Sequence, residues 1–272
     1  MALLQINIHS DALKRDVSMM AVLPVDKTDL KGRFTNKGPF KTLYMLHGLL
    51  GNYMDWTQQT IIERLATEKD LAVIMPSGDN SFYVDREGFG NEYGRFIGEE
   101  IVELSRRMFP LSEKREDTFI GGLSMGGFGA MRNGLLHPET FGYIGSFSGA
   151  LHIFEQPTTD PDYCPFGEDK CFGDIKEVRF TDKNPRVGFL TGKEQKKTMP
   201  SIYMVCGTED PLLEANRSFR DFLQGSGADL TYKEAPGTHN WDFWGTWLPD
   251  FLDWLPLGEA TKGSNSGNVR EE

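Results

Sequence analysis

Short runs of apolar residues alternate along most of this chain with stretches in which apolar residues recur every three or four positions. Short continuous apolar runs are typical of strands covered on both faces, and they lie at residues 42–46, 71–75, 118–123, 144–147 and 201–206. A last strand is predicted at residues 230–234. The helical stretches lie at residues 56–67, 93–108, 126–137, 212–223 and 243–254. Strands and helices that alternate in this way form right-handed crossovers. The sequence therefore predicts an α/β fold with a mostly parallel central sheet and helices on both faces.

The first part of the chain follows a different period. Leu4, Ile6 and Ile8 alternate with polar residues, and the odd positions from 17 to 23 continue the same period of two. Such alternation indicates half-buried antiparallel strands, so we expect an N-terminal hairpin beside the parallel strands.

The domain organisation follows from length and composition. With 272 residues, of which 39% are hydrophobic, the chain suits one large domain or two small ones, and we expect a single domain at residues 1–257. Residues 151–200 are charged and proline-containing without a clear period, and we expect them to form a cap insertion. Residues 258–272 are polar and rich in glycine and serine, and we expect a disordered tail there.

Charge and cysteine content narrow the class of partner and the location. The formal net charge of −11, without a basic cluster, argues against a nucleic-acid or membrane partner. No signal peptide and no apolar stretch approaching the roughly 20 residues of a spanning helix is found. Three cysteines cannot all pair within one chain, which favours a reducing compartment. We expect a cytoplasmic protein, while a leader peptide already removed and a homo-oligomer both stay open.

One serine stands in a glycine-rich run. Residues 122–126 match the pattern G-x-S-x-G, which by itself also fits an ordinary glycine-rich turn. Here the motif follows a predicted strand and opens a predicted helix, which is the setting of a nucleophile held on a sharp turn. We therefore take Ser124 as the candidate nucleophile.

A serine nucleophile needs a histidine base, and the base is oriented by a carboxylate. Among the five histidines, only His152 and His239 follow Ser124 at enough distance along the chain to serve as its base. His239 is preferred because it follows the last predicted strand, at the carboxyl edge of the sheet where ligands bind. Asp210 is the preferred acid, because it follows the preceding strand, and its neighbour Glu209 stays open as the alternative.

Backbone N–H groups must also stabilise the oxyanion of an acyl-transfer intermediate. Met125 supplies one donor as the residue after the nucleophile, and Leu49 in the loop L-H-G-L-L-G-N at residues 46–52 is the candidate for the second. His47 in the same loop is expected to be structural and to bond to backbone.

The motifs HGLLGN, PSGDNSFYVD, GGLSMGGFGAM, SFSGAL, CGTEDPLLEAN and GTHNWDFW occur in this order. Over residues 1–257 the chain resembles the tributyrin esterase and esterase D branch of the α/β-hydrolases, a branch related to S-formylglutathione hydrolases and family 1 carbohydrate esterases. The resemblance implies the α/β-hydrolase fold, a triad of Ser124, Asp210 and His239, and Leu49 and Met125 as oxyanion donors. It also implies that Tyr83 lines the substrate pocket. Trp56 and Trp241 are further candidates for the pocket, with a place in the core as the alternative.

Some positions depart from the glutathione-dependent relatives. Those enzymes carry histidines where this chain has Leu123 and Phe128, and a Thr-Cys pair where it has Gly51 and Asn52. These departures favour a serine carboxylesterase for small acyl groups, acetyl to butyryl, over an S-formylglutathione hydrolase. Esterases for acetylated or feruloylated sugars and an acyltransferase with the same triad stay open.

No metal or organic cofactor is expected. Cys164 and Cys171 have no neighbouring histidine or further cysteine at the spacing of a zinc site. We expect both to be free thiols, with a local disulfide as the alternative.

Overall fold

The computed structural model describes residues 1–154, 169–265 and 268–269. Within them, eight strands form one sheet in the order β1-β2-β4-β3-β5-β6-β7-β8. These strands are β1 (Ala2–Ser10), β2 (Arg15–Leu23), β3 (Lys41–Leu46), β4 (Leu71–Pro76), β5 (Thr118–Leu123), β6 (Tyr143–Phe147), β7 (Ser201–Gly207) and β8 (Leu230–Ala235). β2 pairs antiparallel with β1 and β4, and every pair from β4 to β8 is parallel.

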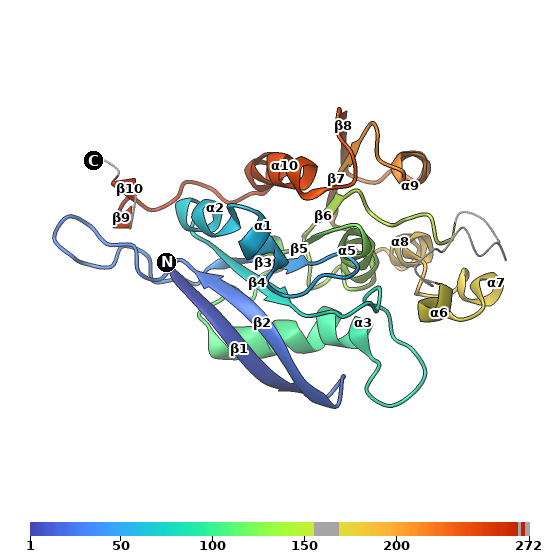
Figure 1. The fold of residues 1–272 in the computed structure, drawn as a ribbon, viewed down its shortest axis with the longest axis horizontal. Helices are drawn as coiled ribbons and strands as arrows, with labels where there is room; N and C mark the ends of the chain where they lie inside the picture. Colours follow the sequence, from blue (N-terminus) through green and yellow to red (C-terminus); the bar gives the residue numbers. More distant parts are fainter. Residues whose placement is uncertain (155–168, 266–267, 270–272) are drawn as a thin grey trace.

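Helices pack on both faces of this sheet (Figure 1). The helical elements are α1 (Asp55–Gln59), α2 (Ile62–Glu68), α3 (Tyr93–Arg95), the π-helix η1 (Phe96–Glu100), α4 (Ile101–Met108), the short 3₁₀ turn η2 (Arg115–Asp117), α5 (Met125–Leu136), α6 (Asp169–Phe172), α7 (Ile175–Val178), α8 (Pro185–Glu194), α9 (Leu213–Gly225) and α10 (Trp241–Trp254). One apolar cluster joins α1, α2 and α10 to the sheet. A second joins α3, η1, α4, α5, α8 and α9 to its opposite face.

The predicted α/β-hydrolase fold, with antiparallel N-terminal strands and a parallel remainder, is confirmed. Each predicted parallel strand differs from the observed one by at most one residue at either end. The bounds of these strands could be predicted because the strands are buried on both faces. Every residue of β4 and β5 is buried, so no polar face interrupts the apolar pattern.

The prediction of one helix over residues 56–67 is wrong. The chain forms α1 and α2 with extended backbone at Thr60 between them. The Thr60 hydroxyl donates to the carbonyl of Trp56 at 2.5 Å and accepts from the amide of Ile62 at 3.2 Å. A threonine side chain that bonds to nearby backbone offers an alternative to helical hydrogen bonds, and the helix ends there.

The predicted helix over residues 93–108 is present but contains a π-helical segment. The backbone runs through α3, η1 and α4 without leaving the helical region. Gly98 lies within η1, where an added Cβ would overlap the His137 imidazole. The apolar spacing alone did not indicate this local change of helical pitch.

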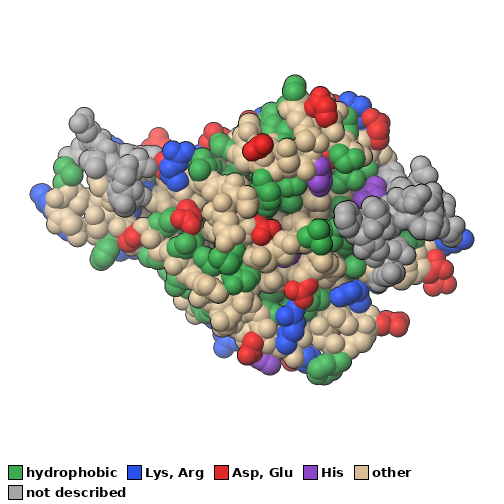
Figure 2. Space-filling model, viewed as in Figure 1, with side chains coloured by type: hydrophobic (Ala, Val, Ile, Leu, Met, Phe, Trp, Pro, Cys, Tyr) green, Lys and Arg blue, Asp and Glu red, His purple; other side chains and the backbone are tan. Residues whose placement is uncertain are grey.

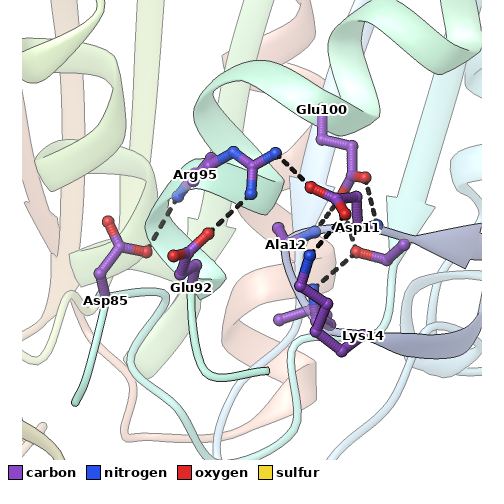
Figure 3. A network of polar contacts seen from close by, with 9 residues as sticks. Asp11, Ala12, Lys14, Asp85, Glu92, Arg95 and Glu100 are labelled. Atoms are coloured by element: carbon purple, nitrogen blue, oxygen red, sulfur yellow. Dashed lines mark hydrogen bonds and ion pairs between the residues drawn. The ribbon is translucent and has the colours of Figure 1, made fainter. Parts of the chain in front are cut away.

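A polar network ties the N-terminal hairpin to this helical segment (Figure 3). Glu100 accepts from the Ser10 hydroxyl at 2.5 Å and from the Asp11 amide at 2.6 Å. Arg95 pairs with Asp11 at 2.8 Å, while its backbone amide donates to Asp85 at 3.0 Å. The network therefore also anchors the loop between β4 and α3, to which Asp85 belongs.

The segment between β6 and β7, predicted as the cap, contains α6, α7 and α8. In the predicted tail, β9 (Ser264–Asn265) pairs with β10 (Asn268–Val269), and Ser264 exchanges backbone hydrogen bonds with Thr28 at 2.7 and 3.2 Å. The bounds of domain, cap and tail stay predictions.

On the face shown in Figure 2, basic and acidic side chains are interspersed rather than separated by sign. None of the helices in the described ranges has the length and apolar character needed to cross a membrane.

Candidate active site

Ser124 lies on the turn between β5 and α5. Its φ of +53° is in the left-handed region, which is unfavourable for a residue with a side chain. A Cβ at Gly122 would overlap the backbone of Gly126, and a Cβ at Gly126 would overlap the carbonyls of Leu46 and His47. The two glycines are therefore needed for close backbone approach, and this explains the spacing around Ser124.

Two loops at the carboxyl edge of the sheet bring His239 and Asp210 to this serine. The Nε2 atom of His239 lies 2.9 Å from the Ser124 hydroxyl oxygen. Its Nδ1 atom lies 2.9 and 3.1 Å from the two carboxylate oxygens of Asp210. Residues separated by up to 115 positions in sequence thus form one continuous hydrogen-bonded chain.

The Asp210 carboxylate is buried, with 0% of its side chain exposed. Burial tends to raise the pKa of Asp210, but hydrogen bonds and the charge of His239 outweigh it and lower the pKa below its usual value. The donors are His239, the Leu212 amide at 2.8 Å and the Ser148 hydroxyl. The carboxylate therefore stays ionised beside the imidazole.

Two residues that the sequence analysis did not select support this arrangement. Trp244 packs edge-on against the His239 ring, with centroids 4.9 Å apart. Its indole N–H donates to the Ser148 hydroxyl at 3.1 Å, and Ser148 in turn contacts Asp210. Their positions were a usable signal, because Ser148 directly follows β6 and Trp244 lies one turn into the helix after His239.

Glu209, the alternative acid, makes different contacts. Its side chain is exposed and accepts from the Gly237 amide at 2.5 Å and the Thr208 hydroxyl at 2.8 Å. The Glu209 side chain therefore stabilises the loop that leads to His239, whereas the Asp210 carboxylate contacts the imidazole itself.

The two candidate oxyanion donors flank the serine. Met125 is the first residue of α5, and Leu49 follows Gly48, whose added Cβ would lie 3.6 Å from the Ser124 Cβ. Among the described residues, no acceptor is found for the backbone N–H of either Leu49 or Met125. Both N–H groups therefore stay candidates for a bond to a substrate oxygen.

The three candidate pocket residues differ in exposure. Trp241 is partly buried and packs edge-on against Trp56, with centroids 5.2 Å apart. Trp56 is 1% exposed, and its indole N–H donates to the Leu46 carbonyl at 3.0 Å. Tyr83 is 0% exposed, and its hydroxyl donates to the His47 carbonyl at 2.9 Å. Contact of these residues with substrate stays a prediction.

His47 bonds to backbone as the sequence analysis expects, at 2.7 Å from the Gly48 carbonyl and 2.9 Å from the Gly78 amide. Of the two cap cysteines, Cys164 lies outside the described residues. Cys171 is buried, and its thiol donates to the Asn80 carbonyl at 3.2 Å. In the ranges given above, no group of three or more histidine, cysteine or acidic side chains is placed to hold a metal ion.

An ion-pair cluster holds the end of β8, which leads into the His239 loop. Glu234 accepts from Arg217 at 2.7 and 2.9 Å and from the Tyr232 hydroxyl at 2.8 Å. The hydrogen bond from Arg217 is the main reason that the pKa of Glu234 falls from 4.5 to about 2.

We expect Glu234→Gln to weaken the acid dependence of folding. A carboxyl whose native pKa is lowered binds more protons in the unfolded chain, so its stabilisation is present above the unfolded pKa. That stabilisation is lost as pH falls from about 4.5 to about 2. Urea unfolding at neutral pH and across this range should show a smaller fall for the variant than for the wild type. Glu214→Gln, at an 82% exposed partner of the same Arg217, is the control and should keep the wild-type slope.

Comparisons with known proteins identify the family of this chain. The family described as "Putative esterase" matches residues 10–255. An acetyl esterase of Caldicellulosiruptor saccharolyticus is 41% identical over 261 residues, which cover 94% of this chain and 98% of the relative.

Two solved structures from Staphylococcus aureus are similar across nearly the whole chain. The fluorophosphonate-binding serine hydrolase F is 28% identical with a TM-score of 0.81, and it covers 93% of this chain and 98% of its own. An S-formylglutathione hydrolase is 28% identical with a TM-score of 0.80 and the same coverage of both chains. The resemblance inferred from the motifs is confirmed at the level of the family. The chain belongs to the "Putative esterase" family of α/β-hydrolases and is an esterase of the serine hydrolase class.

Proposed function

We propose that this esterase hydrolyses short-chain carboxylic esters, acetyl to butyryl, through a Ser124–His239–Asp210 triad. The observation that carries the proposal is the hydrogen-bonded chain from the Ser124 hydroxyl through His239 to the buried Asp210 carboxylate. The 41% identity to an acetyl esterase supports the choice of a small acyl group.

In the first step, His239 Nε2 accepts the Ser124 proton while the hydroxyl oxygen attacks the acyl carbon. The carbonyl oxygen becomes an oxyanion that accepts from the Leu49 and Met125 amides. Asp210 accepts from Nδ1, so that Nε2 is free to act as the base, and it stabilises the imidazolium that forms. His239 then donates its proton to the leaving alcohol, and an acyl-enzyme remains.

In the second step, water attacks the acyl-enzyme with His239 again as the base. The tetrahedral intermediate uses the same two amides and collapses to release the acid and Ser124. Apart from the ester and the water, every group in this scheme belongs to the chain itself.

We expect the highest kcat/KM on acetyl to butyryl esters and a steep fall by octanoyl. Trp56, Trp241 and Trp244 form a row of edge-on aromatic contacts that ends on His239. Rings packed in this way move little, so they leave no room for a longer acyl group. A methylene that fits adds up to about 0.8 kcal/mol of binding, whereas overpacking of a filled pocket costs more than burial returns. A p-nitrophenyl ester series measures the trend. Activity that rises steadily through decanoyl would exclude a closed pocket.

S-formylglutathione is the second candidate substrate, because an S-formylglutathione hydrolase is 28% identical over most of the chain. Leu123 and Phe128, which stand where those enzymes carry histidines, are both buried. We expect kcat/KM on S-formylglutathione to be lower than on p-nitrophenyl acetate, and the reverse order would favour the thioesterase.

A further inference from the structure

Tyr83 lies on a strained and fully buried turn. Phe82 and Tyr83 have φ values of +55° and +56°, and both side chains are 0% exposed. Two successive left-handed residues with bulky side chains are rare, since the side chain crowds the backbone in this region. A conformation of this kind persists only where the surrounding structure constrains it. The contacts of Tyr83 show what that constraint achieves.

Two glycines make room for the Tyr83 ring. A Cβ at Gly78 would overlap the hydroxyl end of the ring, and a Cβ at Gly129 would overlap its other end. Gly129 is inside α5, where glycine weakens a helix relative to alanine. The ring is therefore inserted between the loop at Gly78 and the helix that begins next to Ser124.

Hydrogen bonds hold Tyr83 at its backbone and at the hydroxyl end of its ring. The Tyr83 amide donates to the Ser81 hydroxyl at 3.0 Å, and the Tyr83 carbonyl accepts from Asn133 of α5 at 3.1 Å. At the far end, the phenol donates to the His47 carbonyl at 2.9 Å. Tyr83 thus connects α5 directly to the loop that carries Leu49.

The imidazole of His47 completes the restraint. The Gly78 amide can only donate, so His47 Nε2 must accept, and the proton is on Nδ1. Nδ1 then donates to the Gly48 carbonyl at 2.7 Å. Burial lowers the pKa of His47, which keeps the ring in this neutral form.

The Tyr83 phenol holds the carbonyl of His47, and His47 Nδ1 holds the carbonyl of Gly48. These carbonyls belong to the two peptides on either side of Gly48. A peptide unit is planar and trans, so holding its carbonyl also sets the direction of its N–H. The N–H of the second peptide is that of Leu49. Glycine itself restricts neither peptide, so the orientation depends on Tyr83 and His47.

We propose that Tyr83 is a positioning residue, whose hydroxyl keeps the Gly48 region in the conformation that directs the Leu49 N–H at the oxyanion. This inference rests on the proposed function. It assigns Tyr83 a role through the loop, with no contact to substrate, in place of the pocket-lining role that the resemblance implied. The two roles predict different kinetics.

The test is Tyr83→Phe, which removes one hydroxyl and keeps the ring. Removal of an oxyanion donor typically costs about 10²–10³ in kcat, and an indirect loss of alignment should cost less, about 10-fold. We expect this fall in kcat to be equal for acetyl and butyryl esters, with KM within about twofold. Inhibition by a boronic acid, which forms a tetrahedral adduct with Ser124, should weaken by the same factor as kcat. Rates are counted per site titrated with a fluorophosphonate, so unfolded molecules do not contribute.

Tyr44→Phe is the matched control. Tyr44 is also 0% exposed, and its hydroxyl bonds to Ser105 at 2.7 Å, away from the oxyanion loop. This variant should keep kcat and boronate inhibition within about twofold.

An unchanged kcat in Tyr83→Phe would overturn the inference. A loss confined to KM, or one that depends on acyl length, would overturn it in favour of contact with substrate. An equal loss of kcat in Tyr44→Phe would also overturn the inference, because the effect would then be general destabilisation. Each of these results leaves labelling of Ser124 intact, whereas failure of the proposed function would appear as a fully active Ser124→Ala variant.

Discussion

Replacing Ser124 by alanine is expected to leave a folded protein whose kcat on p-nitrophenyl acetate is lower by about 10⁶-fold. No acyl-enzyme can form without the hydroxyl that lies 2.9 Å from His239 Nε2. A fluorophosphonate probe should label the wild type once per chain, at Ser124, and should not label the variant.

Ser146→Ala is the matched control for this experiment. Ser146 is buried on β6, and its hydroxyl has no hydrogen-bond partner among the described residues. It should keep wild-type activity and labelling. Substantial activity in Ser124→Ala, or labelling of another residue at an equal rate, would contradict the assignment of the nucleophile.

The second large effect is expected for Asp210→Asn, which should lower kcat by about 10⁴-fold. An asparagine that presents its NH₂ group to His239 favours the tautomer with the proton on Nε2, and that nitrogen can then no longer accept the Ser124 proton. The Leu212 amide and the Ser148 hydroxyl would still bond to the side-chain oxygen, which favours this orientation. The measurement is kcat on p-nitrophenyl acetate, with folding checked by thermal unfolding.

Glu209→Gln is the control, because the Glu209 carboxylate bonds to the Gly237 amide and the Thr208 hydroxyl, whereas the His239 ring bonds to Asp210. We expect kcat within about threefold of the wild type, since a glutamine oxygen can still accept these hydrogen bonds. If Glu209→Gln instead caused the large loss and Asp210→Asn did not, Glu209 would be the acid.

The inner strands of the sheet were predictable because their burial is uniform. Strands such as β4 and β5 are covered on both faces, so their sequences are continuous apolar runs with clear ends. The helices were less predictable where a local side-chain contact competed with the helical pattern. The Thr60 hydroxyl separates α1 from α2, although the apolar spacing continues across it.

The candidate site was predictable in outline because a parallel sheet brings the carboxyl ends of its strands to one edge. Ser124, Asp210 and His239 each follow a strand, and this order along the chain selected Ser124 and His239 and reduced the choice of acid to Asp210 or Glu209. Their neighbours were harder to find. Trp244 and Ser148 act through contacts between a helix and a strand end, so their positions along the chain make them candidates but do not show that they meet.

The sequence by itself determined the order of strands and helices, the sharp turn at Ser124 and the short set of carboxylates and histidines that could serve it. These features depend on local patterns of burial and on glycine spacing, which can be read along the chain. Only the tertiary structure decided that Asp210 and not Glu209 meets the His239 ring. It also decided that Trp56 and Tyr83 are buried and bond to the carbonyls of Leu46 and His47. The physical reason is that a side chain's direction and its burial depend on elements distant in sequence, such as α5 beside Tyr83, whose approach no local pattern records.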